Sequence, residues 1–101
     1  GNIKWGMKMK TIYKFALFPA NLQVVKIQGL IKVISVVEQY NGIVLYAMVD
    51  TEEKKKYNVN IAIRGTGHEL GEIYTKPNKC IGTVKLDEGK IVLHVFLMKD
   101  K

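Results

Sequence analysis

The sequence predicts a mainly β, single-domain protein: an antiparallel β-sandwich or half-open barrel of about seven strands, with at most one short helical turn. Three observations lead to this fold class. Apolar and polar residues alternate in short runs, as they do in half-buried strands. Turn-forming residues separate these runs at short intervals. No segment of the 101 residues carries a strong helical pattern.

The first three strands are expected at residues 10–17, 22–28 and 30–39. Residues 10–17 alternate, and Phe18-Pro19-Ala20-Asn21 ends the run, since proline and asparagine favour turns. Gly29 breaks the chain between the second strand and the third. The third segment is rich in β-branched and apolar residues, which favour a strand.

A hairpin is expected after the third strand, because Asn41-Gly42 between apolar runs favours a two-residue type I′ turn. Residues 43–49 then form the fourth strand, and residues 50–56 turn the chain into the fifth, 57–63. Within that turn, Lys54-Lys55-Lys56 follows Glu52-Glu53. The local charge nearly cancels, so we expect a solvated hairpin tip rather than a nucleic-acid patch.

The remaining chain contains a crossover and one more hairpin. Residues 69–75 fit either one helical turn or an irregular crossover, which Pro77-Asn78 closes. Residues 79–85 are expected to form the sixth strand and residues 91–98 the seventh, with a hairpin turn between them at 87–90.

His94 lies in the seventh strand, where both faces are largely apolar. This pattern predicts a central strand buried on both sides, or a strand with one face against another protomer. A histidine in such a strand is expected to be a satisfied core or interface group. One ring nitrogen then accepts a hydrogen bond and the other donates one.

The chain boundaries and composition exclude several classes of protein. Residues 1–8 are expected to be a disordered or tag-derived lead-in, and residues 9–101 the single β domain. No apolar run reaches the roughly 18 residues of a membrane span, and the N-terminus lacks a signal-peptide core. We therefore expect a cytoplasmic protein. The single cysteine, Cys80, excludes an internal disulfide and a cysteine-rich zinc site.

The net charge is +7, and lysines make up all but one of the sixteen basic residues. Lysine attracts phosphate as a point charge, whereas specific base and phosphate readers use the arginine fork. The lysines therefore predict solubility and long-range attraction of anions, without selecting one anion.

Residues 64–68, Arg-Gly-Thr-Gly-His, are the strongest candidate for a binding site. They follow a predicted strand and contain the only arginine, two glycines, a hydroxyl group and one of two histidines. Exposed amides in such a loop, flanked by Arg64 and His68, can hold an anion or the polar edge of a nucleotide. The same Gly-Thr-Gly run is also typical of a simple tight turn.

Tyr74 and a nearby lysine, Lys76 or Lys79, complete the candidate site. Tyr74 follows the glycine loop and can stack on a flat ring. The whole set suits a small phosphorylated ring compound. Its members are Arg64, Gly65, Thr66, Gly67, His68, Tyr74 and Lys76.

No catalytic residue, metal or cofactor is expected. General acid–base chemistry needs a base with a partner that orients it. His68 and His94 are candidate bases, and the sequence does not fix which acidic residue would orient either; the candidates are Asp50, Glu69, Glu72 and Asp87. The sequence has no His/Cys cluster at metal spacing, no P-loop and no nucleophile elbow. The protein is therefore expected not to be an enzyme.

Five runs of the sequence resemble a family of short proteins encoded by bacteriophages and prophages. The runs are Met9 to Phe15, Leu45 to Asp50, Gly65-Thr66-Gly67-His68, Ile81 to Val84, and His94 to Leu97. Their order and spacing cover nearly all of residues 9–97. One departure is Glu69, because the family often has proline after the histidine.

The resemblance implies a phage protein that acts in the host bacterial cytoplasm. The expected function is a non-catalytic anti-defence sponge, which binds and sequesters a host cyclic nucleotide or ADP-ribose-type immune signal. Exposed sheet edges and the apolar last strand predict a homo-oligomer. Two alternatives stay open: a protein-interaction inhibitor of a host enzyme, and a small basic nucleic-acid-binding β domain.

Overall fold

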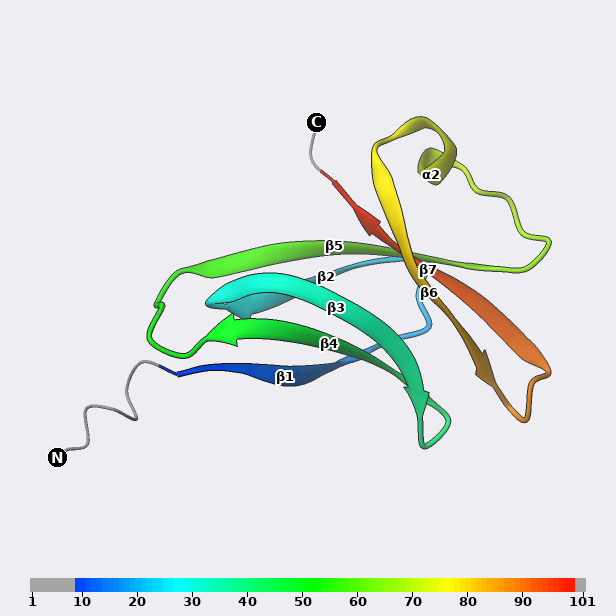
Figure 1. Cartoon of the computed structure of the whole chain (residues 1–101). Helices are drawn as coiled ribbons and strands as arrows, with labels where there is room; N and C mark the ends of the chain where they lie inside the picture. The colour runs from blue at the N-terminus through cyan, green and yellow to red at the C-terminus, as the bar shows by residue number, and fades with distance from the viewer. Residues whose placement is uncertain (1–8, 100–101) are drawn as a thin grey trace, which may run out of the picture.

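The computed structural model describes residues 9–99 of the chain. These residues form two antiparallel β-sheets that pack on each other, with one short helix between two of the strands (Figure 1). The predicted fold class is confirmed: the protein is a mainly β single domain of seven strands, and neither sheet closes into a barrel. The lead-in predicted for residues 1–8 lies outside the described residues.

The strands follow the predicted runs closely. The elements are β1 (Lys10–Leu17), β2 (Leu22–Gln28), β3 (Leu30–Gln39), β4 (Gly42–Asp50), β5 (Lys56–Gly65), α2 (Glu72–Thr75), β6 (Asn78–Leu86) and β7 (Ile91–Met98). The first three strands and the last have the predicted bounds. The others extend one or two residues further, because pairing with neighbouring strands continues to the turns.

The chain passes from one sheet to the other three times, between β1 and β2, between β2 and β3, and between β4 and β5. One sheet has the order β1-β4-β3, and the other has the order β2-β5-β7-β6. Thus β1 pairs with β4 rather than with β2, and β2 pairs with β5. As predicted from its apolar faces, β7 is a central strand, with β5 and β6 on its two sides. It is not buried on both faces, because only Val95 is fully buried and most of its other residues are half-buried.

The core lies between the two sheets and consists of the inward-facing residues of each strand. Along β4, buried and half-buried positions alternate without exception. Full burial of an aliphatic side chain stabilises a fold by about 1.5–3 kcal/mol, so this interior supplies most of the favourable free energy. The buried cluster comprises Leu17, Ile27, Val36, Ile43, Leu45, Ala47, Val49, Val59, Ile61, Ile63, Val84, Leu86 and Val95.

The two sheets approach each other closely where β3 passes β6 (Figure 1). Gly82 of β6 lies against Val36 of β3, and a Cβ atom at position 82 would come within 2.7 Å of Val36 Cγ1. Both strands are irregular: β3 shifts register at Ile31 and Ile34, and β6 shifts at Ile81. Such bulges bend a strand and increase its twist, which favours the crossing at a residue without a side chain.

The β3–β4 turn differs by one residue from the Asn41-Gly42 turn predicted. Gln39 pairs with Gly42, so the two loop residues are Tyr40 and Asn41, with φ of 52° and 62°. Positive φ at both central positions is the backbone pattern of a type I′ turn. Side chains stabilise this position, because the backbone N–H of Asn41 donates to the Glu38 carboxylate, and Asn41 Oδ1 accepts the Asp87 N–H at 2.7 Å.

The crossover between β5 and β6 contains the one helical turn that the sequence allowed, α2. Ile73 of α2 is buried, and so is Ala62 of β5, whose side chain points away from the core between the sheets. The segment around α2 therefore covers part of the outer face of the four-stranded sheet. Over residues 9–99, no helix has the length and apolar character needed to cross a membrane.

Gly29 links β2 to β3 beside the β4–β5 turn and is predicted to be intolerant of any side chain. Its N–H donates to the Lys55 carbonyl at 2.8 Å, and its carbonyl accepts the Asp50 N–H at 2.8 Å. Its φ is +68°, and an added Cβ would overlap the Asp50 carbonyl oxygen. Gly29→Ala should lower the free energy of unfolding by more than about 2 kcal/mol, measured by urea denaturation.

Gly89→Ala is the matched control, because Gly89 also has positive φ (+88°) but has no atom within 4 Å of an added Cβ. This substitution should lower the free energy of unfolding only by the strain of an alanine in the left-handed region, about 1–2 kcal/mol. An equal loss of unfolding free energy in the two variants would show that the contact with Asp50 does not affect stability.

Candidate functional site

The Gly65–His68 turn leads out of β5 and is held by backbone hydrogen bonds. The His68 N–H donates to the Gly65 carbonyl at 3.0 Å, which closes the turn. The Thr66 N–H donates to the Val92 carbonyl at 3.2 Å, which ties the turn to the beginning of β7. Gly67 has φ of +90°, a conformation that glycine adopts without steric cost.

His94 fixes this turn through its side chain. Its Nε2 atom lies 2.7 Å from Thr66 Oγ1, and its Nδ1 atom lies 3.0 Å from Thr83 Oγ1. In a neutral imidazole one nitrogen donates and the other accepts, so the two hydroxyl groups take opposite roles. Both ring nitrogens have partners, as the sequence predicted. We call the group Thr66, His94 and Thr83 the histidine clamp.

The sequence did not show that the histidine clamp belongs to the glycine turn. Arg64, His94 and Thr83 are direct cross-strand neighbours on β5, β7 and β6, and this register depends on pairings between distant segments. The three runs that carried the family resemblance in this half of the chain each contribute one clamp residue. The presence of all three clamp residues in these runs was the sequence signal that could have indicated the clamp.

The His68 ring packs on the backbone of Gly65. A Cβ atom at position 65 would lie 2.8 Å from His68 Cε1 and 2.9 Å from Nδ1, so the flat ring occupies the space that any other residue would fill. His68 is exposed to solvent. Glycine at position 65 is therefore needed to keep the imidazole in this place.

A hollow of about 330 Å³ lies beside the turn. We call it the turn hollow. It combines a histidine, a lysine and a hydroxyl group from the turn and the β6–β7 hairpin with apolar side chains at the beginning of β7. Its lining residues are Gly65, Thr66, His68, Lys90, Ile91, Val92 and Leu93. Sequence reasoning missed Lys90, because its approach to the turn depends on the pairing of β7 with β5.

The Arg64 side chain donates hydrogen bonds to backbone carbonyl oxygens, a structural role that the sequence did not predict. Its Nη1 atom donates to the carbonyl oxygens of Asn21 and Ile63, both at 3.0 Å, and its Nε atom donates to the Glu69 carbonyl at 3.1 Å. These bonds join the β1–β2 loop, β5 and the crossover. Arg64 does not line the turn hollow.

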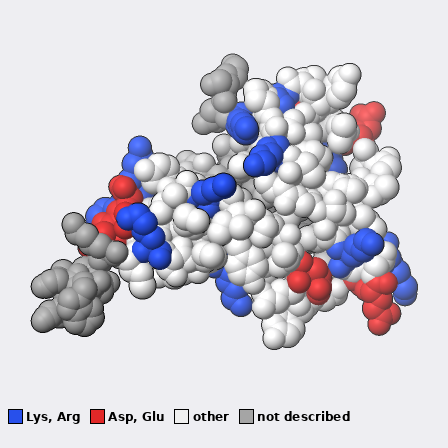
Figure 2. Space-filling view, viewed as in Figure 1, with Lys and Arg blue, Asp and Glu red and all other residues white. Residues whose placement is uncertain are grey.

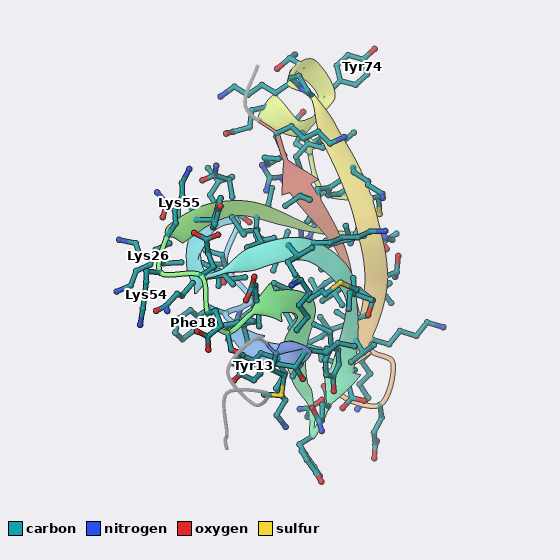
Figure 3. All side chains as sticks on the ribbon, turned by 60° about the vertical axis from the view of Figure 1, so that its left-hand side comes forward. Tyr13, Phe18, Lys26, Lys54, Lys55 and Tyr74 are labelled. Atoms are coloured by element: carbon teal, nitrogen blue, oxygen red, sulfur yellow. The ribbon has the colours of Figure 1, made fainter. Side chains whose placement is uncertain are left out.

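Tyr74 and Lys76 lie apart from the turn hollow. Tyr74 is 83% exposed, and its ring projects from α2 away from the sheets (Figure 3). Lys76 Nζ lies 3.8 Å from Glu72 Oε2. Lys76 lines a second cavity of about 380 Å³ beneath α2, which we call the α2 cavity. Its lining residues are Leu22, Gln23, Val24, Asn60, Ile61, Glu72, Lys76, Met98 and Lys99.

The residues predicted for one site are thus divided. Gly65, Thr66 and His68 line the turn hollow, and Lys76 lines the α2 cavity. Gly67 belongs to the same turn, but neither it nor Tyr74 lines either space. Among residues 9–99, no three His, Cys, Asp or Glu side chains gather in a way that could hold a metal ion.

Lysines are spread over the visible face of the molecule, while acidic groups gather mainly near the turns (Figure 2). At the β4–β5 turn, Lys10 Nζ lies 3.6 Å from Asp50 Oδ2. Lys10, Asp50, Glu52, Glu53 and Lys54 line a common surface hollow there. Opposite charges are therefore interspersed at this end, as the sequence predicted for the Glu-Lys run. The predicted hairpin tip is wrong, because β4 and β5 lie in different sheets and the turn connects the two sheets.

Residues 9–101 match a family described as a domain of unknown function, DUF7352. The chain belongs to this family, and the match spans all seven strands and the histidine clamp. No curated protein and no solved structure matches the chain.

Thr83→Val should weaken the fold through the histidine clamp. The substitution keeps the side-chain shape but leaves His94 Nδ1 without its hydroxyl partner. We expect a loss of about 0.5–1.5 kcal/mol in the free energy of unfolding, measured by urea denaturation. Thr11→Val on β1 is the control, expected to stay within about 0.5 kcal/mol of wild type. A loss no larger than the control's would mean that the clamp does not stabilise the turn.

Proposed function

We propose that this protein binds a small phosphorylated nucleotide in the turn hollow and sequesters it without chemical change. One observation carries the proposal: His68 and Lys90 line the same hollow as the glycine backbone of a turn that the histidine clamp holds in place. A preformed anion site of this kind binds a phosphate without first ordering the loop.

The hollow has two kinds of wall, which suit the two parts of a nucleotide. The imidazole of His68 and the ammonium group of Lys90 are donors for phosphate oxygens. Ile91, Val92 and Leu93 supply an apolar wall for a ribose or base. The volume of about 330 Å³ lies within the usual range of small-molecule sites, about 300–1,000 Å³.

Sequestration is favoured over catalysis by the surroundings of the two histidines. A general base is normally oriented by a partner, most often a carboxylate. Within residues 9–99, no carboxylate hydrogen-bonds either histidine, and His94 is engaged with two threonine hydroxyl groups instead. A bound nucleotide would therefore be held and released intact.

The family resemblance of the five sequence runs adds the biological setting to the proposal. A phage-encoded protein that captures a cyclic nucleotide or ADP-ribose-type immune signal in the host cytoplasm would act as an anti-defence sponge. A homo-oligomer would raise the number of sites per particle. The edge strands β1 and β2 carry exposed apolar residues, including Ile12, Tyr13 and Val24, and such edges favour association.

A second candidate is a protein-interaction inhibitor of a host enzyme. The same exposed apolar side chains favour it, and so does Phe18 in the loop between β1 and β2. This function would use the edges of the sheets and would need no small ligand.

The test is native mass spectrometry of the protein with cyclic dinucleotides, cyclic trinucleotides and cyclic ADP-ribose isomers. The wild-type protein should gain one ligand mass per site, and denaturation should release the ligand unaltered. His68→Ala and Lys90→Ala should each weaken binding by about tenfold or more, because each removes a charge-assisted hydrogen bond.

Lys85→Ala is the matched control, since Lys85 lies on the same hairpin but lines a different hollow, with Glu38 and Asp87. It should bind like the wild type. A wild-type protein that gains no ligand, or one whose affinity is indifferent to His68 and Lys90, would contradict the proposal. A pull-down from host lysate would then test the inhibitor function.

A further inference from the structure

We propose that the α2 cavity is a second binding site, which takes a flat aromatic molecule that carries one anionic group. This inference does not depend on the nucleotide proposal, because the α2 cavity and the turn hollow have no lining residue in common. It rests on three features of the cavity: an apolar floor, a free amide group in that floor, and cations at its rim.

The floor is the outer face of the four-stranded sheet. Val24, Asn60 and Met98 lie directly opposite one another on β2, β5 and β7, and Leu22 lies on the same face of β2 as Val24. Leu22 is 52% exposed and Val24 is 60% exposed. These two side chains therefore present apolar surface that a flat ring can cover, with a gain of about 25 cal/mol for each Å² removed from water.

Asn60 places a polar group within this apolar row. Its side chain is half-buried, and it forms no hydrogen bond with any atom of residues 9–99. Its neighbours in register, Val24 and Met98, have no side-chain N–H or hydroxyl group to pair with it. The amide can therefore donate to, or accept from, a heteroatom at the edge of a bound ring.

The rim carries positive charge. Lys76 follows α2, and Lys99 follows β7; the Lys99 N–H donates to the Pro77 carbonyl at 3.0 Å. This bond holds the backbone of the two lysines on the same side of the cavity. Glu72 pairs with Lys76, so two cations and one anion face the ligand. The balance favours one anionic group over a neutral or cationic ligand.

The size of the cavity suits a small molecule. The α2 cavity has a volume of about 380 Å³. That volume lies within the range typical of small-molecule sites. An aromatic carboxylate, sulfonate or phosphate fits both the apolar floor and the cationic rim.

The probe is 1-anilinonaphthalene-8-sulfonate, an aromatic anion whose fluorescence rises in apolar surroundings. N-phenyl-1-naphthylamine, which lacks the sulfonate, is the neutral comparison. The folded wild-type protein should bind the anionic probe at one site per chain and at least about fivefold more tightly than the neutral one. Amide chemical shifts in NMR spectra should change around Val24, Asn60 and Met98.

Two variants separate the floor from the rim. Val24→Glu places a carboxylate in the floor at an exposed position, so the fold should survive and both probes should bind about tenfold more weakly. The double variant Lys76→Gln and Lys99→Gln should bind the sulfonate probe more weakly and the neutral probe as the wild type does. Lys85→Gln is the control, since Lys85 lies outside the cavity, and it should bind both probes like the wild type.

The outcomes also separate this site from the nucleotide site. His68→Ala and Lys90→Ala should leave the probe affinity unchanged, and Val24→Glu should leave nucleotide binding unchanged. Equal affinity for the two probes, chemical-shift changes centred elsewhere, or probe binding that survives Val24→Glu in a folded protein would overturn the proposal. Thermal denaturation followed by circular dichroism establishes that each variant is folded.

Discussion

The close packing of β3 on β6 at Gly82 is the contact on which the rest of this architecture depends. The absence of a side chain at Gly82 lets Val36 of β3 approach the β6 backbone, so the two sheets share one continuous apolar interior. The next residue, Thr83, points to the other face of the sheet, where its hydroxyl group hydrogen-bonds the ring of His94. The other ring nitrogen of His94 hydrogen-bonds Thr66. The side chains of Thr83, His94 and Thr66 thus connect the glycine turn to the packed core.

Hydrogen bonds of Arg64 hold the crossover on the outer face of the four-stranded sheet, beside the apolar contact that Ile73 makes there. Arg64 donates to carbonyl oxygens of three segments, including the β1–β2 loop and the crossover. A guanidinium group is suited to this role because its donors form a rigid planar fork. With the crossover held in this way, the turn hollow and the α2 cavity are separate spaces with no lining residue in common.

Charge acts on two length scales in this protein. The excess of lysines over acidic residues attracts anions from a distance, an effect that salt screens beyond roughly 10 Å. Only a few lysines lie where they can select a ligand at short range: Lys90 at the turn hollow, and Lys76 and Lys99 at the α2 cavity. At the β4–β5 turn, by contrast, basic and acidic groups are interspersed, which limits any local field.

The sequence by itself determined the strands, because alternation and turn residues act over a few neighbouring positions. It therefore predicted β1, β2, β3 and β7 at their observed bounds, and it predicted that His94 would have partners for both ring nitrogens. It also located the glycine turn, with Gly65 and His68 adjacent in space. These features depend on local backbone preference and on burial.

Only the tertiary structure decided which strands pair and where polar side chains meet. β1 pairs with β4 rather than β2, since burial of the inner faces outweighs the modest entropy of closing a longer loop. The same long-range pairing brought Thr83 and Lys90 to the glycine turn, and it engaged Arg64 with backbone carbonyls. The β3–β4 turn lies one residue earlier than predicted, and there Asn41 Oδ1 accepts the N–H of Asp87, a residue far away in the chain. Local pattern cannot encode such contacts, because they exist only once distant strands are in register.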